Sequence, residues 1–411
     1  MRTSIVNGIV LDTESMRMLG ERTVVCENDL IVDVAEPATS DTAGADLVID
    51  ARGRFVLPGF IDGHVHHVIT TMDFPRLMRL TDVERSLGMA GLAAGMVHRG
   101  FTTVRDTGGD ITGLIRAIEQ GMCDGPRIIR SGRVISQTGG HGDFAPVDGP
   151  LCACQIHSNH MGHVADGADA VRKAVRTELR AGSDFIKIMS SGGVTSLTDP
   201  FDAIQYTAEE VLAATVETDH RHTYTTSHAY QPDAISLAIE NGVRCIEHGN
   251  LLDAPTARRM AELGVTMVPT LVSHVAIFEI GSKSGLPQRN LDKNAGAYEF
   301  GRSSIAIAKK AGVELGFGTD LLGEAQPWQN REFAIRAELE PAVDVLRSMY
   351  QVNARLCRLE GEIGVVSPGA SADLVITPVD PLTQLPLLAD PEESLSAVIA
   401  RGRLVVDRLE D

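Results

Sequence analysis

The sequence predicts an α/β protein in which a (β/α)8 TIM barrel is joined to a small β-sandwich built from both chain ends. Between residues 56 and 361, short apolar runs alternate with segments of helical periodicity. Eight apolar runs take part in this alternation, and βα units repeated that many times are typical of a parallel barrel. A doubly wound open sheet is the alternative. It is disfavoured because no glycine-rich dinucleotide fingerprint follows the first run.

The two chain ends, residues 1–55 and 362–411, have strand character without a helical period. Strands are expected at residues 4–12, 22–34, 45–50, 372–377 and 395–406. The second of these contains a turn signal at 27–29, so it is predicted to be a hairpin. We expect the two ends to pair into one composite β-sandwich beside the barrel domain of residues 56–361.

The barrel elements follow from the alternation itself. Strands are predicted at residues 56–66, 102–106, 127–131, 185–189, 223–228, 243–248, 265–270 and 313–320. Helices are predicted between them at residues 83–99, 111–120, 168–181, 208–218, 233–240, 255–263 and 297–310. In a barrel of this kind the active site lies at the carboxyl ends of the strands, so the residues that end each strand are the candidates for chemistry.

Composition and charge restrict the class of protein. The chain has 411 residues and a net charge of −18, which disfavours nucleic acid or an anionic membrane as a partner. It has no apolar run long enough to span a bilayer, and the first residues lack the apolar core of a secretory signal. Its six scattered cysteines are typical of reduced thiols, so we expect a cytoplasmic protein.

Metal-ligating side chains stand at the ends of several predicted strands. His64 and His66 close the first strand, and the two-residue period of a strand places both imidazoles on one face. Such a pair can hold one metal ion, although a satisfied histidine pair near a turn is the alternative. Later strands add His228, His248 and Asp320. Lys187 lies inside an otherwise apolar strand, where a buried ammonium is costly unless it is paired or neutralised.

This set resembles the amidohydrolase superfamily over nearly the whole chain. The matching segments are residues 58–66, Lys187, 227–229, 246–249 and 318–320. In similar enzymes the lysine is carbamylated by CO₂, and the carbamate bridges two divalent metal ions. The resemblance then implies that one metal is held by His64, His66, Lys187 and Asp320, and the other by Lys187, His228 and His248. We expect zinc, because imidazole, carboxylate and a catalytic water suit it.

The chemistry implied by this resemblance is hydrolysis of an amide or related bond by a metal-bridging hydroxide. Paired metal ions lower the pKa of a shared water and polarise a carbonyl. Asp320 would take the proton of that water and pass it to the leaving amine. The substrate is expected to be a small molecule, and the enzyme is expected to be a homo-oligomer.

Two further stretches resemble the dipeptidase branch, the prolidase-like enzymes that also hydrolyse N-acyl amino acids; imidazolonepropionase is a more distant relative. One is residues 136–143, and the other is residues 185–194 followed by 228–232. The resemblance implies that His141 polarises the substrate carbonyl and that Tyr230 contacts the substrate carboxylate. The alternatives are a plain turn around His141 and a tyrosine at the rim of the site.

A hydrolase or deaminase acting on cyclic amides or aminated heterocycles remains the main alternative. The mononuclear deaminases of the superfamily usually lack the bridging lysine and carry Glu where this chain has Gln231. A catalytically dead scaffold of the same fold is disfavoured because all six ligands are present. His157, His160 and His163 are spaced closely enough for a further metal site, but a loop that covers the active site is the favoured interpretation.

Overall fold

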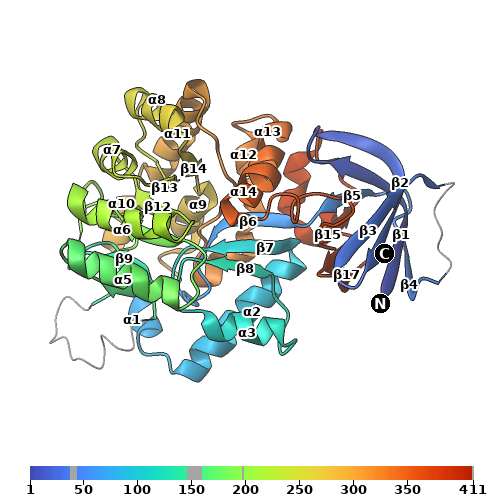
Figure 1. Ribbon diagram of the computed structural model, residues 1–411, viewed down its shortest axis with the longest axis horizontal. Helices are drawn as coiled ribbons and strands as arrows, with labels where there is room; N and C mark the ends of the chain where they lie inside the picture. The colour runs from blue at the N-terminus through green and yellow to red at the C-terminus, as the bar shows by residue number, and fades with distance from the viewer. Residues whose placement is uncertain (38–43, 146–159, 197–198, 410–411) are drawn as a thin grey trace.

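A computed structural model describes residues 1–37, 44–145, 160–196 and 199–409 (Figure 1). One part of the molecule contains parallel strands surrounded by helices. The other part is a sheet in which strands from the two ends of the chain lie side by side, blue and red in the figure. Within the described residues, none of the helices has both the length and the apolar character needed to cross a membrane.

The sheet of the chain ends contains eight strands in the order β17-β16-β15-β5-β1-β2-β3, and β4 pairs with β1. Strand β15 runs antiparallel to β5, with Leu374 opposite Pro58, and this pairing joins the two ends. The strands are β1 (Arg2–Asp12), β2 (Arg17–Glu27), β3 (Leu30–Ala35), β4 (Leu47–Asp50), β5 (Phe55–Pro58), β15 (Leu374–Thr377), β16 (Ala397–Ala400) and β17 (Arg403–Asp407). Hydrogen bonds connect all eight strands into one sheet. The sequence instead predicts a β-sandwich, in which two sheets pack face to face.

The parallel strands form two sheets. The first has the order β6-β7-β8, and the second has the order β10-β9-β11-β12-β13-β14. Their bounds are β6 (Phe60–Val65), β7 (Phe101–Asp106), β8 (Arg127–Arg130), β9 (Val134–Ser136), β10 (Gly162–Val164), β11 (Ile186–Met189), β12 (Thr225–Ala229), β13 (Cys245–His248) and β14 (Thr266–Val268). The eighth predicted strand links the two sheets, because Leu315 forms a parallel bridge with Met267 and Phe317 O accepts a hydrogen bond from Gly63 N at 2.7 Å.

The predicted strand 56–66 is divided in the structure. Its first residues are β5 of the terminal sheet, and its last residues are β6 of the parallel sheet. Gly59 lies at the division, where a Cβ atom would stand 1.9 Å from Thr102 Oγ1. The absence of a side chain at residue 59 therefore lets the chain pass from one sheet to the other against β7.

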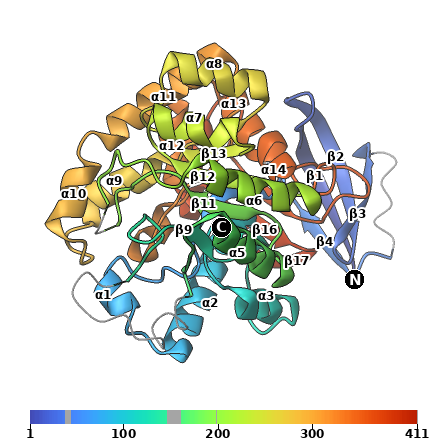
Figure 2. The same ribbon diagram turned by 60° about the vertical axis from the view of Figure 1, so that its left-hand side comes forward.

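Seven helices lie within two residues of their predicted bounds. They are α2 (Asp82–His98), α3 (Thr112–Glu119), α5 (Ala168–Arg180), α6 (Ala208–His220), α7 (Pro232–Glu240), α8 (Ala254–Leu263) and α11 (Ala297–Ala311). Thr81 with Glu84 and Thr207 with Glu210 form capping boxes that fix the starts of α2 and α6. Figure 2 shows β9, β11, β12 and β13 near the centre of the molecule, with α7 and α8 beyond β13.

The remaining helices were not predicted. They are α1 (Phe74–Leu77), α9 (Leu271–Ile280), α10 (Gln288–Asn294), α12 (Arg331–Ala337), α13 (Ala342–Arg347), α14 (Asn353–Cys357) and α15 (Pro391–Ser394), with 3₁₀ turns at Gly323–Trp328 and Leu385–Ala389 and a π-helical turn at Ser348–Val352. Much of α9 is buried, so it carries no polar face by which a helical period could be recognised.

Candidate metal centre and active site

The candidate residues come together at the carboxyl ends of neighbouring parallel strands. In the register of these strands, His228 of β12 lies opposite Met189 of β11, and His248 of β13 lies opposite Ala229 of β12. His248 and Asp320 both have a left-handed backbone, with φ of 74° and 51°. That conformation costs a residue with a side chain about 1–3 kcal/mol, and such residues concentrate at functional sites.

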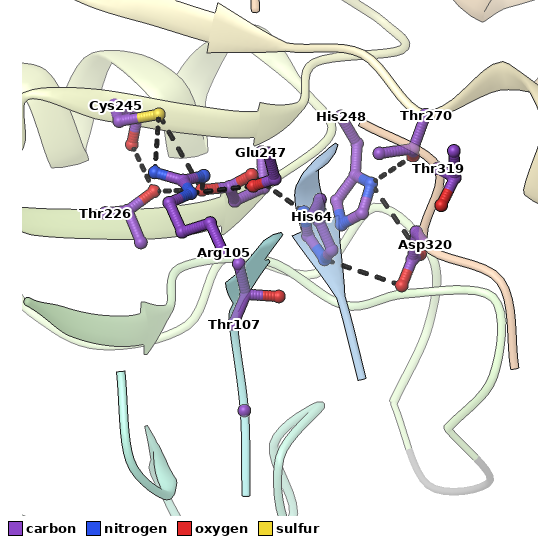
Figure 3. A network of polar contacts seen from close by, with 12 residues as sticks. His64, Arg105, Thr107, Thr226, Cys245, Glu247, His248, Thr270, Thr319 and Asp320 are labelled. Carbon is purple, nitrogen blue, oxygen red and sulfur yellow. Dashed lines mark hydrogen bonds and ion pairs between the residues drawn. The ribbon is translucent and has the colours of Figure 1, made fainter. Parts of the chain in front are cut away.

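His64, His66 and Asp320 form the tightest cluster. The two Nε2 atoms of His64 and His66 are 3.3 Å apart. Asp320 Oδ1 lies 3.4 Å from His64 Nε2 and 3.3 Å from His66 Nε2. One ligand atom from each residue lies within 4.8 Å of the others, so the three can hold a metal ion together. Figure 3 shows Asp320 facing His64 from the chain segment that follows Thr319.

His228 and His248 lie beside this cluster. The ring centre of His248 is 4.9 Å from that of His64 and 4.7 Å from that of His228. His228 Nε2 is 3.0 Å from Gly192 O, which can only accept, so this nitrogen carries the proton and Nδ1 has the lone pair. His248 Nδ1 is 2.8 Å from Thr270 Oγ1, and its Nε2 is not used by that contact. Each histidine therefore has one nitrogen that can bind a metal.

Lys187 lines the same pocket and is 1% exposed. In the described part of the chain its amine has no hydrogen bond or ion pair within contact distance. Burial lowers the pKa of Lys187, while Glu247 and Asp320 oppose this shift. An amine with a lowered pKa is more often unprotonated, which is the form that reacts with CO₂, so its environment fits the predicted carbamate.

The other titratable groups have the protonation states that metal ligands need. Burial, assisted by the charge of Lys187, lowers the pKa of His64 to about 4. Burial also lowers the pKa values of His228 and His248 well below the usual range. Although burial opposes its ionisation, His64 and His66 hold the pKa of Asp320 at about 2. Neutral imidazoles and an ionised carboxylate are the forms that bind divalent cations.

Sequence reasoning assigned no role to Glu247 and Arg105, which lie directly behind His64. Glu247 Oε2 is 2.7 Å from His64 Nδ1, and Glu247 Oε1 pairs with Arg105 Nη2. Both side chains are 0% exposed. Both are charged residues within predicted strands, which is a weak signal of a buried pair. The contact of Glu247 with His64 could not be identified in this way, because it depends on how the strands are arranged in space.

His141 and Tyr230 also reach the pocket. The ring of His141 stacks on that of His228 with centres 4.2 Å apart, and His141 Nδ1 is 3.8 Å from Asp199 Oδ2. Tyr230 is 4% exposed, so it is a buried wall residue and not a rim aromatic. Its ring centre lies 5.3 Å from that of His248. Burial raises the pKa of Tyr230 well above the usual value, which keeps its hydroxyl protonated as a hydrogen-bond donor.

The rest of the pocket wall is largely apolar. Among the described residues that line it, Lys187 is the one lysine or arginine. The apolar lining includes Val68, Ile69, Phe74, Phe144, Ile277 and Leu322. His274 of α9 also faces the pocket, but its Nδ1 and Nε2 already bond Asn294 and Asn250 at 2.8 and 2.9 Å, so neither nitrogen is available to a metal.

The two described loop histidines, His160 and His163, do not join this cluster. His160 Nε2 lies 3.5 Å from Asp82 of α2, and His163 Nδ1 lies 3.2 Å from Glu178 of α5. His157 lies outside the described residues. The two described histidines therefore pair with carboxylates on different helices.

Comparison with known proteins decides the family. The model of the amidohydrolase family matches residues 55–405, which is most of the chain. This chain belongs to the amidohydrolase family. The predicted resemblance to the amidohydrolases, the α/β fold class and the class of enzyme, a hydrolase acting on C–N bonds, are thereby confirmed.

Similar proteins include the ochratoxinase of Aspergillus niger, which is 28% identical over 354 residues and covers 83% of this chain and 74% of that protein. Among solved structures, a prolidase complexed with N-methylphosphonate-L-proline is 40% identical, with a TM-score of 0.94 over 99% of this chain and 100% of the other. A Xaa-Pro dipeptidase with methionine in its active site is 28% identical, with a TM-score of 0.88 over 98% and 99% of the two chains.

Proposed function

We propose that this amidohydrolase is a metal-dependent enzyme that cleaves the amide bond of a dipeptide, such as Xaa-Pro, or of an N-acyl amino acid. The observation that supports this most strongly is the convergence of His64, His66 and Asp320 within 4.8 Å, in contact with the pocket of Lys187, His228 and His248. The prolidase, dipeptidase and ochratoxinase among its relatives support the same class of substrate.

The donor atoms fit two divalent metal ions. His64, His66 and Asp320 would hold one ion, His228 and His248 the other, and Lys187 would reach both as a carbamate formed when its neutral amine adds CO₂ and loses a proton. Imidazole and carboxylate ligands favour zinc. Bound there, the ions would activate water and polarise the scissile carbonyl.

The chain's own residues would then complete the reaction. Asp320, ionised and facing both His64 and His66, would accept the proton of the attacking water and deliver it to the leaving amine. His141 would donate a hydrogen bond to the carbonyl oxygen as negative charge develops on it. One such donor lowers the barrier by about 3–4 kcal/mol in comparable sites.

Substrate selection would come from Tyr230 and from the apolar wall. The protonated hydroxyl of Tyr230 would bind the free α-carboxylate of the substrate, and the apolar side chains around it would favour uncharged substituents. The deaminase alternative is less well supported, since Gln231 starts α7 with its side-chain amide bonded to Asp202 O and does not line the pocket.

The fold would serve this chemistry as a (β/α)8 barrel. We propose that the two parallel sheets, linked through Leu315 and Phe317, are arcs of one barrel formed by residues 56–361, with residues 1–55 and 362–411 as the separate β module. We also propose a homo-oligomeric, cytoplasmic enzyme whose partner is its small-molecule substrate. The net charge of −18 supports the exclusion of nucleic acid.

A substrate screen tests this proposal. Zinc-loaded protein would be offered dipeptides and N-acyl amino acids, each with its matched carboxamide, alongside cyclic ureas, lactones and aminated heterocycles. Preferential hydrolysis of the acids with a free α-carboxylate is expected. Preference for the carboxamides or for the cyclic compounds would show that the proposed substrate class is wrong.

A further inference from the structure

We infer that Glu247, held by Arg105, is a positioning residue that fixes His64 in the tautomer able to bind metal. This inference rests on the proposed function, because it assigns His64 as a ligand. Figure 3 shows the three side chains in a row, with Arg105 farthest from Asp320, Glu247 in the middle and His64 facing Asp320.

Both carboxylate oxygens of Glu247 are occupied by donors. Oε2 lies 2.7 Å from His64 Nδ1, and Oε1 accepts from Thr226 Oγ1 and from Arg105 Nη2. The side chain is 0% exposed, so none of these donors can be replaced by bulk water. The carboxylate is thereby fixed in position from both sides.

This arrangement decides which nitrogen of His64 carries the proton. A carboxylate only accepts hydrogen bonds, so Nδ1 must be the protonated nitrogen. The lone pair is then on Nε2, which faces His66 Nε2 at 3.3 Å and Asp320 Oδ1 at 3.4 Å. In the other tautomer an N–H bond would point at the metal position, and the Nδ1 lone pair would face a carboxylate.

Arg105 supplies the charge that makes a buried Glu247 tolerable, and it is itself rigidly held. Its Nε atom donates to Gly63 O at 2.7 Å, and its Nη1 atom is 3.0 Å from the Tyr224 hydroxyl. Its guanidinium also lies 5.0 Å from the ring centre of Phe185. The Gly63 contact matters most, because it ties Arg105 to the backbone immediately before His64.

The variant that tests this positioning role is Glu247→Gln, which keeps the shape of the side chain but replaces one oxygen by an NH₂ group. If the amide oxygen accepts from His64, the NH₂ group faces the donors of Arg105 and Thr226. If it accepts from those donors, the NH₂ group faces His64 Nδ1 and favours the tautomer that cannot bind metal. Either orientation destabilises the ligand arrangement seen in the structure.

The matched control is Glu340→Gln. Glu340 and Arg336 form another buried pair, with side chains 1% and 0% exposed, and this pair touches no proposed metal ligand. The two variants break the same kind of interaction at the same depth. Any loss of zinc affinity or stability that comes only from breaking a buried Arg–Glu pair should therefore appear in both variants.

The experiment measures zinc binding to chelator-stripped protein by titration against a competing chelator, with the thermal unfolding midpoint of each variant recorded beside it. We expect Glu247→Gln to lower the affinity for one of the two zinc ions by about 10–100-fold, while the other ion is bound as in wild type. We expect Glu340→Gln to bind both ions as wild type does.

The inference is overturned if folded Glu247→Gln binds both ions as tightly as wild type, or if both variants lose affinity equally. Wild-type protein that binds no zinc would instead contradict the proposed function. Should Glu247→Gln fail to fold, Arg105→Lys decides by the same criterion, since it keeps the charge but loses the fork that reaches Gly63, Tyr224 and Glu247 together.

Discussion

The pocket at the strand ends and the contact between α9 and α12 each hold a carboxyl group, with opposite results. The side chain of Asp320 in the pocket is 22% exposed, and Glu332 of α12 is 0% exposed. Asp320 faces two histidines and Lys187, which hold its pKa at about 2 against the effect of burial. The carboxyl group of Glu332 accepts a hydrogen bond from Val272 N at 2.7 Å, and burial raises its pKa to about 8 despite Arg336. The neighbours of a carboxyl group, together with its degree of burial, decide whether it is ionised and can bind a metal.

The histidines show the same contrast. His64 and His66 are two residues apart and converge on Asp320, because the strand they end lies beside the segment that carries Asp320, whose backbone N donates to His64 O at 2.8 Å. His160 and His163 are three residues apart, a spacing equally suited to metal, yet they pair with Asp82 and Glu178 on separate helices. Spacing in the sequence becomes a site only where the fold brings further ligands to the same place.

The largest expected effect comes from replacing the ionised carboxyl group. Asp320→Asn should lower kcat by at least about 10²–10⁴-fold, because it removes both the proton acceptor and a proposed ligand. KM should change much less. Glu332→Gln, the corresponding carboxyl-to-amide replacement at the contact between α9 and α12, should leave kcat near that of wild type. Steady-state kinetics of both variants measure this, and near-normal turnover by Asp320→Asn would contradict the assigned role.

Metal content separates the two groups of histidines. His66→Ala should lose one of two bound ions, since it removes a ligand whose Nε2 lies 3.3 Å from Asp320 Oδ1. His163→Ala, which breaks only a contact with Glu178, should keep both ions. Elemental analysis of the purified variants measures the metal content. Equal metal loss from both variants would contradict the claim that His66 binds metal and His163 does not.

A smaller effect is expected at the pocket wall. Tyr230→Phe should raise KM for substrates with a free α-carboxylate by about 10–100-fold, the value of a hydrogen bond to a charged group. KM for the matched carboxamides should change little. Measuring both substrates with wild type and variant isolates the contribution of the hydroxyl group. An equal rise for both would mean that Tyr230 shapes the pocket without recognising the carboxylate.

The smallest effect on activity is expected from the titration of Glu332. This titration should instead make the stability of the protein depend on pH. The pKa of Glu332 is about 8 in the folded protein, above the value of about 4.3 expected in the unfolded chain. Its stabilising contribution is therefore fully present below about pH 4.3 and is lost as pH rises towards 8. Glu332→Gln should become more stable relative to wild type by a few kcal/mol across that range, because each pKa unit corresponds to about 1.4 kcal/mol.

Denaturant unfolding of wild type and Glu332→Gln at several pH values measures this difference. A difference in unfolding free energy that does not change with pH would mean that Glu332 ionises normally in the folded state.

Much of this molecule could be predicted from local sequence patterns, because helical periodicity and capping residues are local signals. The capping box of Thr81 and Glu84 starts α2 one residue before its predicted start. The ends of the strands could also be predicted, and they identified His64, His66, His228, His248, Lys187 and Asp320 as candidate ligands. The division at Gly59 could not be predicted, because it depends on the approach of Thr102 from another strand.

Two other features were missed for physical reasons of the same kind. Helix α9 is buried on most sides and has no polar face to reveal its period. Glu247 points to the same interior as His64 only because β6 and β13 face each other across the parallel strands, a tertiary relationship absent from the local sequence.

Metal content of the wild-type protein tests the central claim most directly. Purified enzyme should contain close to two divalent ions per chain, and chelation should abolish amide hydrolysis until zinc is returned. Intact-mass analysis under native conditions should also show the added CO₂ on Lys187. Protein with only trace metal whose hydrolysis is unaffected by a chelator would contradict the account.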